Sequence, residues 1–220
     1  MAFATAPSLA PAYSRGEEIA NAATHGLGAA LSLAAAVALA WKAASRSDGL
    51  SLLGFALFGA SLLVLFTAST VYHAAARPEL RRRLRVADHA SIYLLIAGTY
   101  SAYCLTALRG PVGWSIFAII WFLAIAGLVL SILFTGRFKV LETVGYIAMG
   151  WVIIFAMVPL KRALGPASLA LLFGGGLSYT AGAVVYGIKR IPWNHAIWHL
   201  FVLGGAACHV ASVLAIPLAR

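Results

Sequence analysis

Apolar residues occur in seven long runs along the chain, each close to the roughly 20 residues that a helix needs to cross a lipid bilayer. Turn-forming stretches such as Ser47-Asp48-Gly49, Arg109-Gly110-Pro111 and Gly165-Pro166 separate these runs. We therefore predict an all-α fold, a seven-transmembrane helix bundle. The approximate spans are 19–41, 50–75, 86–107, 112–134, 141–160, 168–188 and 194–216.

Composition supports a polytopic membrane protein. The chain is 62% hydrophobic and only 10% charged, whereas a soluble domain carries about 25% charged residues. The net charge of +10 is explained by basic loops facing anionic lipid, so no nucleic-acid partner is implied. Because the loops are too short to fold alone, we expect a short cytoplasmic tail over 1–16 and one transmembrane domain over 17–220.

The distribution of positive charge predicts the orientation in the cell membrane, since cytoplasmic segments are enriched in Lys and Arg. In the predicted topology, ten basic residues share the side of the N-terminus, and the other six lie opposite. The N-terminus is therefore expected in the cytoplasm and the C-terminus outside. The ten are Arg15, Arg77, Arg81, Arg82, Arg83, Arg85, Arg137, Lys139, Lys189 and Arg190.

Polar residues far apart in the sequence are predicted to reach one depth of the bilayer. His73 ends the second run, Asp88 opens the third, and His195 and His199 begin the seventh. The last two share one helix face, since they are four residues apart. Ser69 lies one turn before His73 on its face. Ionisable groups inside a membrane are costly and indicate a functional site.

Three imidazoles with one open position form a typical catalytic zinc site. Zinc lowers the pKa of a bound water, and a nearby carboxylate such as Asp88 can accept its proton. Other interpretations remain open. The histidines can face lipid headgroups. Asp88 can stabilise the start of a helix through the helix dipole or pair with Arg85. Ser69 can bond its own backbone.

Two further residues, Asn21 and His25, form a same-face pair near the start of the first run. We expect them to support the site, although packing or capping explains them as well. Other polar residues receive no role from the sequence: Glu18, His89, Glu142 and His209.

In combination these motifs resemble the hemolysin III family, the bacterial members of the progestin and adiponectin receptor superfamily. The resemblance covers about residues 17–215. The motifs that carry it are Glu18-x-x-Asn21-x-x-x-His25-Gly26, Ser69-x-x-x-His73, Asp88 at the start of the third run, and His195-x-x-x-His199.

The resemblance implies a zinc ion near the cytoplasmic side, with His73, His195 and His199 as ligands. Asp88 would then hold the zinc-bound water, with Ser69 beside it. The wider superfamily includes alkaline ceramidases, and its bacterial members have been linked to membrane lipid homeostasis. The long N-terminal domain of the eukaryotic receptors is lacking, so binding of a protein hormone is not implied.

Three functions follow from these observations. The first is a zinc-dependent hydrolase acting on a membrane lipid with a ceramide-like amide. The second is a non-enzymatic sensor of lipid or membrane fluidity, with zinc as a structural element. The third is a pore-forming hemolysin, which the gathering of polar residues at one end disfavours. Membrane lipids are the expected partners, and self-association is possible.

Overall fold

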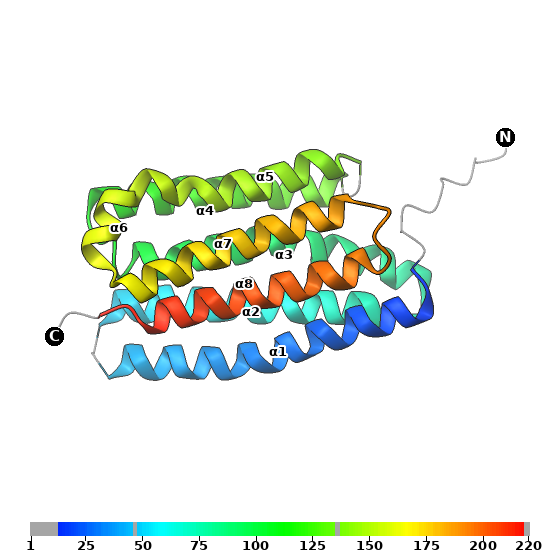
Figure 1. The fold of residues 1–220 in the computed structure, drawn as a ribbon, viewed down its shortest axis with the longest axis horizontal. Coiled ribbons are helices and arrows are strands. Elements are labelled where there is room, and N and C mark those ends of the chain that lie inside the picture. Colours follow the sequence, from blue (N-terminus) through cyan, green and yellow to red (C-terminus); the bar gives the residue numbers. More distant parts are fainter. Residues whose placement is uncertain (1–12, 46–47, 135–136, 218–220) are drawn as a thin grey trace.

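The computed structural model describes residues 13–45, 48–134 and 137–217, and these are almost entirely helical (Figure 1). No strand occurs in these ranges, which confirms the all-α prediction. Residues 1–12 of the predicted tail lie outside them. The elements are α1 (Arg15–Ala44), α2 (Gly49–Ala74), α3 (Pro78–Cys104), α4 (Pro111–Phe134), α5 (Lys139–Trp151), the 3₁₀ helix η1 (Val152–Ala156), α6 (Met157–Ala163), α7 (Pro166–Gly187) and α8 (Asn194–Leu214).

The helices form the predicted seven-membered bundle. Six spans are long and apolar enough to cross a membrane, and α5, η1 and α6 together make one of them (Val140–Ala163). The remaining long helix is α3, whose hydropathy is lowered by arginines in its first turns. Because seven helices alternate in direction, α1 begins and α8 ends at opposite ends of the bundle (Figure 1).

The third helix begins earlier than the sequence pattern predicted, at Pro78 rather than near Val86. Proline suits the first helical position because its φ is already helical and its missing N–H would have no partner there. Glu79 in the first turn adds a favourable interaction with the helix dipole. Most of the arginine-rich segment is therefore helical rather than a loop, and it stays at the same end of the bundle.

The fifth span is interrupted by a 3₁₀ segment, η1, and one tyrosine satisfies the backbone at the break. The hydroxyl of Tyr100, on α3, donates to the backbone oxygens of Met149 and Gly150 at 3.0 and 2.9 Å. The same hydroxyl accepts a bond of 2.7 Å from the amide of Ile153. Polar groups freed by a helix break must find such partners in a membrane, and this contact fixes the bend.

Packing within the bundle is uneven. The closest neighbours are α2 with α1 and α3, and α7 with α8, whereas α5 packs more sparsely on α3 and α7. Figure 1 shows α4 and α5 along one side of the bundle and α1 along the other. The sparse contact of α5 leaves an internal cavity that reaches the site described below.

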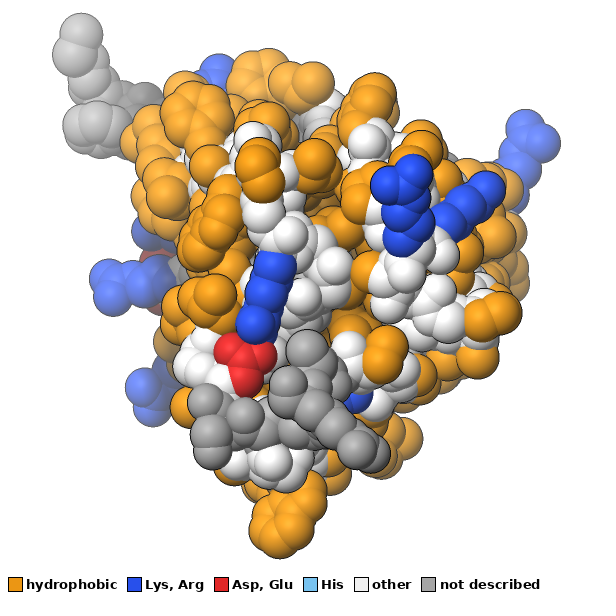
Figure 2. Space-filling view, turned by 90° about the vertical axis from the view of Figure 1, so that its left-hand side faces the viewer, with side chains coloured by type: hydrophobic (Ala, Val, Ile, Leu, Met, Phe, Trp, Pro, Cys, Tyr) orange, Lys and Arg blue, Asp and Glu red, His pale blue; other side chains and the backbone are white. Residues whose placement is uncertain are grey.

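Basic residues divide between the two ends as the topology predicted. The arginines of α3 lie where α1 and α8 begin, at the right in Figure 1. The opposite end also carries Lys and Arg side chains among many hydrophobic ones (Figure 2). There Arg109 pairs with Asp48, the residue that caps the start of α2. Which end faces the cytoplasm stays a prediction.

Candidate metal centre

Three histidines from two helices meet at the end of the bundle where α1 begins. His73 lies in the last turn of α2, and His195 and His199 lie one turn apart at the start of α8. Each offers one ring nitrogen, and these atoms all lie within 4.8 Å of one another. His73 and His199 are only 4% and 2% exposed. The structure therefore brings the three predicted ligands together in a buried group.

Hydrogen bonds fix which nitrogen is free in two of these rings. His73 Nδ1 lies 2.7 Å from Glu18 Oε2. An ionised carboxylate can only accept, so the Nδ1–H donates and Nε2 keeps its lone pair. His199 Nδ1 donates similarly to the backbone oxygen of Asn21, at 3.2 Å. Metal-binding histidines commonly have their second ring N–H fixed in this way, so both rings are prepared to bind through Nε2.

The arrangement fits a zinc ion. Tetrahedral zinc bound at about 2.0–2.1 Å places its ligand nitrogens roughly 3.3 Å apart. The Nε2 atoms of His73 and His195 are 3.1 Å apart, close to this value. Among the described residues the group contains three imidazoles and no fourth His, Cys, Asp or Glu, an arrangement typical of catalytic rather than structural zinc sites. The geometry suits the predicted ligand set, and binding itself stays a prediction.

The predicted supporting residues lie directly against this group. The ring of His25 stacks on His199 with centroids 3.5 Å apart and planes 8° from parallel. Its other neighbour is the Phe66 ring, met edge-on at 5.0 Å, and neither ring nitrogen of His25 has a hydrogen-bond partner among the described residues. Asn21 is fully buried and contacts His199 through its backbone oxygen. Both residues therefore contact His199, and their supporting role stays a prediction.

Asp88 and Ser69 lie on the side of the histidines that faces the cavity, which they line together with His195 and His199. Ser69 is 1% exposed, and its hydroxyl has no hydrogen-bond partner among the described residues. Asp88 Oδ2 is 3.3 Å from Nδ1 of His89. A carboxylate and a hydroxyl thus line the same cavity as two of the candidate metal ligands, and the roles given to Asp88 and Ser69 stay predictions.

Glu18 is a neighbour of the candidate metal ligands that the sequence did not assign to the site. Its carboxylate bonds His73 and also pairs with Arg81 of α3. Glu18, Asn21 and His25 recur at spacings of three and four residues, which places them on one helix face. That periodicity could have assigned Glu18 to the site, whereas no local signal connects Arg81 with it.

Two other neighbours of the histidines also escaped prediction. The Thr24 hydroxyl lies 3.3 Å from Nδ1 of His199. The Tyr13 ring stacks on His195 with centroids 4.9 Å apart, and Tyr186 of α7 contacts the same imidazole at 5.3 Å. Aromatic rings therefore cover His195 from two segments that are distant in sequence.

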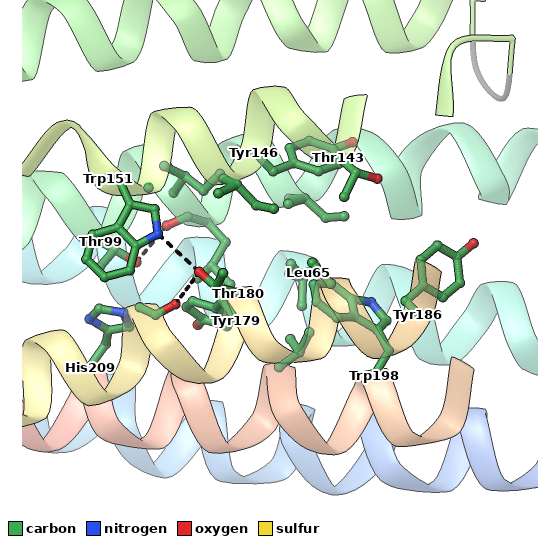
Figure 3. A pocket seen from close by; sticks show the side chains of 18 of the residues that line it. Leu65, Thr99, Thr143, Tyr146, Trp151, Tyr179, Thr180, Tyr186, Trp198 and His209 are labelled. Atoms are coloured by element: carbon green, nitrogen blue, oxygen red, sulfur yellow. Dashed lines mark hydrogen bonds between the residues drawn. The ribbon is translucent and has the colours of Figure 1, made fainter. Parts of the chain in front are cut away.

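An elongated cavity of about 180 Å³ extends from the site into the bundle. Its lining comes mainly from α3, α5, α7 and α8 and is largely apolar (Figure 3). Along α8 the lining runs from His195 to His209, an axial distance of about 21 Å. His209 therefore lies at the far end, apart from the three histidines, and Glu142 lines the cavity from α5.

The helical bundle and its buried histidines define a multi-pass membrane protein with a candidate metal centre. The family model for haemolysin-III related proteins matches residues 13–210. Over 198 residues the chain is 45% identical to Hemolysin-3 of Bacillus cereus, covering 90% of each protein. It is 44% identical over 198 residues to the Hemolysin-3 homolog of Bacillus subtilis (strain 168), covering 90% of this chain and 93% of that one. The chain therefore belongs to the hemolysin III family of cell-membrane proteins.

Similarity to a more distant relative is consistent with the wider superfamily that the motifs indicated. The human protein called monocyte to macrophage differentiation factor is 31% identical over 163 residues, which cover 71% of this chain and 67% of that protein. The resemblance stated from the polar motifs is thus confirmed.

Proposed function

We propose that the protein binds zinc through His73, His195 and His199 and hydrolyses a ceramide-like amide of a membrane lipid. The observation that carries this proposal is the position of the three imidazoles, with Asp88 and Ser69 beside them, at one end of a largely apolar cavity. When bound to three imidazoles, zinc polarises a carbonyl oxygen and lowers the pKa of water toward neutrality.

The residues of the chain would supply the other parts of the reaction. The carboxylate of Asp88 can accept a proton from water, as a general base does. Ser69 Oγ–H has no hydrogen-bond partner among the described residues and would donate to the carbonyl oxygen of a lipid. The apolar lining of the cavity offers a place for a lipid chain. The predicted orientation opens this site toward the cytoplasm and the inner leaflet.

The first test is metal content of the detergent-purified protein. Wild type is expected to carry about one zinc per chain, since three imidazoles form one site. His199→Ala removes a ligand and should lose the metal. Cys208→Ala is a matched control because Cys208 lies on the same helix, more than two turns beyond the candidate ligand His199. A well-folded wild type without metal would overturn the proposal.

The second test separates chemistry from binding. Asp88→Asn keeps the size of the side chain but cannot accept the proton, so turnover of a short-chain ceramide should fall by about 10²–10⁴-fold. The zinc content should stay near that of wild type. Equal turnover by wild type and Asp88→Asn would contradict the role given to the carboxylate.

A non-enzymatic lipid sensor is the second candidate, because the candidate metal ligands join α2 to α8. In that case zinc would stabilise a bundle whose cavity binds lipid without turnover. Removing zinc with a chelator would then lower the unfolding temperature, and no lipid amide would be cleaved. A pore former, the third prediction, would show dose-dependent conductance in proteoliposomes.

A further inference from the structure

The half of the cavity far from the three candidate metal ligands is lined by several polar side chains as well as apolar ones. They come from α3, α5, α7 and α8 and lie around the labelled His209 and Trp151 in Figure 3. None of the lining residues in this half is Lys, Arg, Asp or Glu, since the acidic lining residues Asp88 and Glu142 belong to the other half. This lining favours an uncharged polar ligand, because a charged group would find no ionised partner here except a protonated His209.

Most of these polar groups are already satisfied by bonds within the protein. Tyr103 donates from its hydroxyl to Ser212 Oγ at 2.8 Å. The indole N–H of Trp151 donates to Thr180 Oγ1 at 3.1 Å, a bond drawn in Figure 3. The hydroxyl of Tyr100 is held by the backbone at the break in the fifth span. These groups have little capacity left for a ligand.

Two neighbouring groups are exceptions. Nδ1 of His209 and the hydroxyl of Tyr179 are both buried and have no hydrogen-bond partner among the described residues. The two rings stack with centroids 5.5 Å apart and planes 17° from parallel, and both line the cavity. A buried polar group without a partner costs about 1–3 kcal/mol. Such a pair requires an explanation, and a bound polar group supplies one.

The packing around the pair indicates a built site. A side chain at Gly175 of α7 would place its Cβ 2.7 Å from His209 Nε2. Likewise, a Cβ at Gly205 of α8 would lie 2.7 Å from Tyr179 Cε1. Each helix thus carries a glycine four residues before its own ring, which makes room for the ring of the other helix. The sequence therefore provides space for both rings at the contact of α7 and α8.

We infer that Tyr179 and His209 form a second ligand subsite, which binds a neutral hydroxyl carried on the long apolar chain of a lipid. A hydroxyl group can both accept from a phenol O–H and donate to an unprotonated imidazole nitrogen, so it offers the two kinds of hydrogen bond that these atoms lack. The subsite lies about 15 Å from His199 along α8, which sets the distance between the hydroxyl and the polar head of the ligand. This inference rests on the proposed function, because it assumes that a lipid occupies this cavity.

The test compares binding of long-chain fatty acids with and without a terminal hydroxyl, over a series of chain lengths, to the purified protein. Wild type should bind the hydroxylated acid roughly threefold to tenfold more tightly at the chain length that reaches the pair, the effect of one or two net hydrogen bonds. Tyr179→Phe removes only the hydroxyl and should abolish most of this preference. Tyr103→Phe is the matched control, because its hydroxyl already has a partner, and should keep the preference.

Stability gives an independent readout. Removing an unpaired buried hydroxyl should leave the unfolding temperature of Tyr179→Phe unchanged or higher, whereas Tyr103→Phe should lower it. The subsite is overturned if wild type binds both acids equally, which would mean that water alone satisfies the pair, or if the preference survives in Tyr179→Phe. Equal binding leaves the proposed lipid function intact, whereas binding of neither acid would contradict both.

Discussion

At the scale of single residues, the Glu18 carboxylate connects the candidate metal centre to the rest of the bundle. It holds the imidazole of His73 in one tautomer and pairs with Arg81 at the start of α3. A carboxylate in this position raises the basicity of the ligand and orients its ring. The charge of Glu18 should therefore affect metal binding although Glu18 does not contact the metal position.

Replacing Glu18 by glutamine tests this role. The amide keeps the shape of the side chain but removes its charge, so zinc affinity should fall about 10- to 100-fold. Competition with a zinc-binding dye in detergent measures the change. Glu79→Gln is the control, because Glu79 is an exposed acid that pairs with Arg82 on the surface of α3. An unchanged affinity in Glu18→Gln would show that the carboxylate only anchors Arg81.

At the scale of whole helices, the close approach of α2 and α3 depends on a small residue. A Cβ at Gly98 would overlap the Ser61 side chain and lie 2.9 Å from the backbone oxygen of Leu57. Glycines at such contacts let helix backbones pack closely within a membrane. The positions of His73 and Asp88, on these two helices, depend on this contact.

Gly98→Ala should therefore destabilise the protein by about 1–3 kcal/mol, the usual cost of forcing extra volume into a packed interior. Thermal unfolding in detergent measures the change. Gly174→Ala is the matched control, since no atom lies within 4 Å of the added Cβ, and alanine favours helix by up to about 1 kcal/mol. Equal stability of the two variants would show that α2 and α3 can separate without cost.

The end of α8 is held by a lysine from α1. Nζ of Lys42 donates to the backbone oxygens of Val213, Leu214 and Ile216 at 3.3, 2.5 and 2.6 Å. A cation at a helix C-terminus donates hydrogen bonds to carbonyls that have no intrahelical partner, and it interacts favourably with the helix dipole. Lys42→Met should thus lower stability by about 1–3 kcal/mol in thermal unfolding. Lys161→Met, at an exposed position on α6, should change it little.

At the scale of the whole molecule, the arginines of α3 and the candidate metal centre occupy the same end of the bundle. The rule that cytoplasmic segments are enriched in Lys and Arg predicts that this end lies inside the cell. In spheroplasts, a cysteine-free background with Lys161→Cys should react with a membrane-impermeant maleimide. With Arg83→Cys, reaction should require permeabilisation. The reverse pattern would place the metal centre outside and contradict a site open to the cytoplasm.

The sequence alone determined the membrane class, the seven helices and the end of the bundle at which the histidines gather. Each of these depends on local properties, because the length and polarity of one segment decide whether it crosses a bilayer. The spacing of His195 and His199 is equally local, since helical geometry puts them on one face. The start of α3 was misplaced because charged residues in a first turn resemble a loop in a hydrophobicity pattern.

Only the tertiary structure decided which side chains complete the site and what lies beyond it. Glu18 meets His73, Tyr100 satisfies the break in the fifth span, and Tyr179 lies against His209. The partners in each pair lie on different helices, so no periodicity within one segment could join them. The cavity likewise exists because α5 packs sparsely against α3 and α7. Contacts of this kind depend on how side chains of separate helices fill the space between them. The pattern of residues within one helix carries no information about that packing.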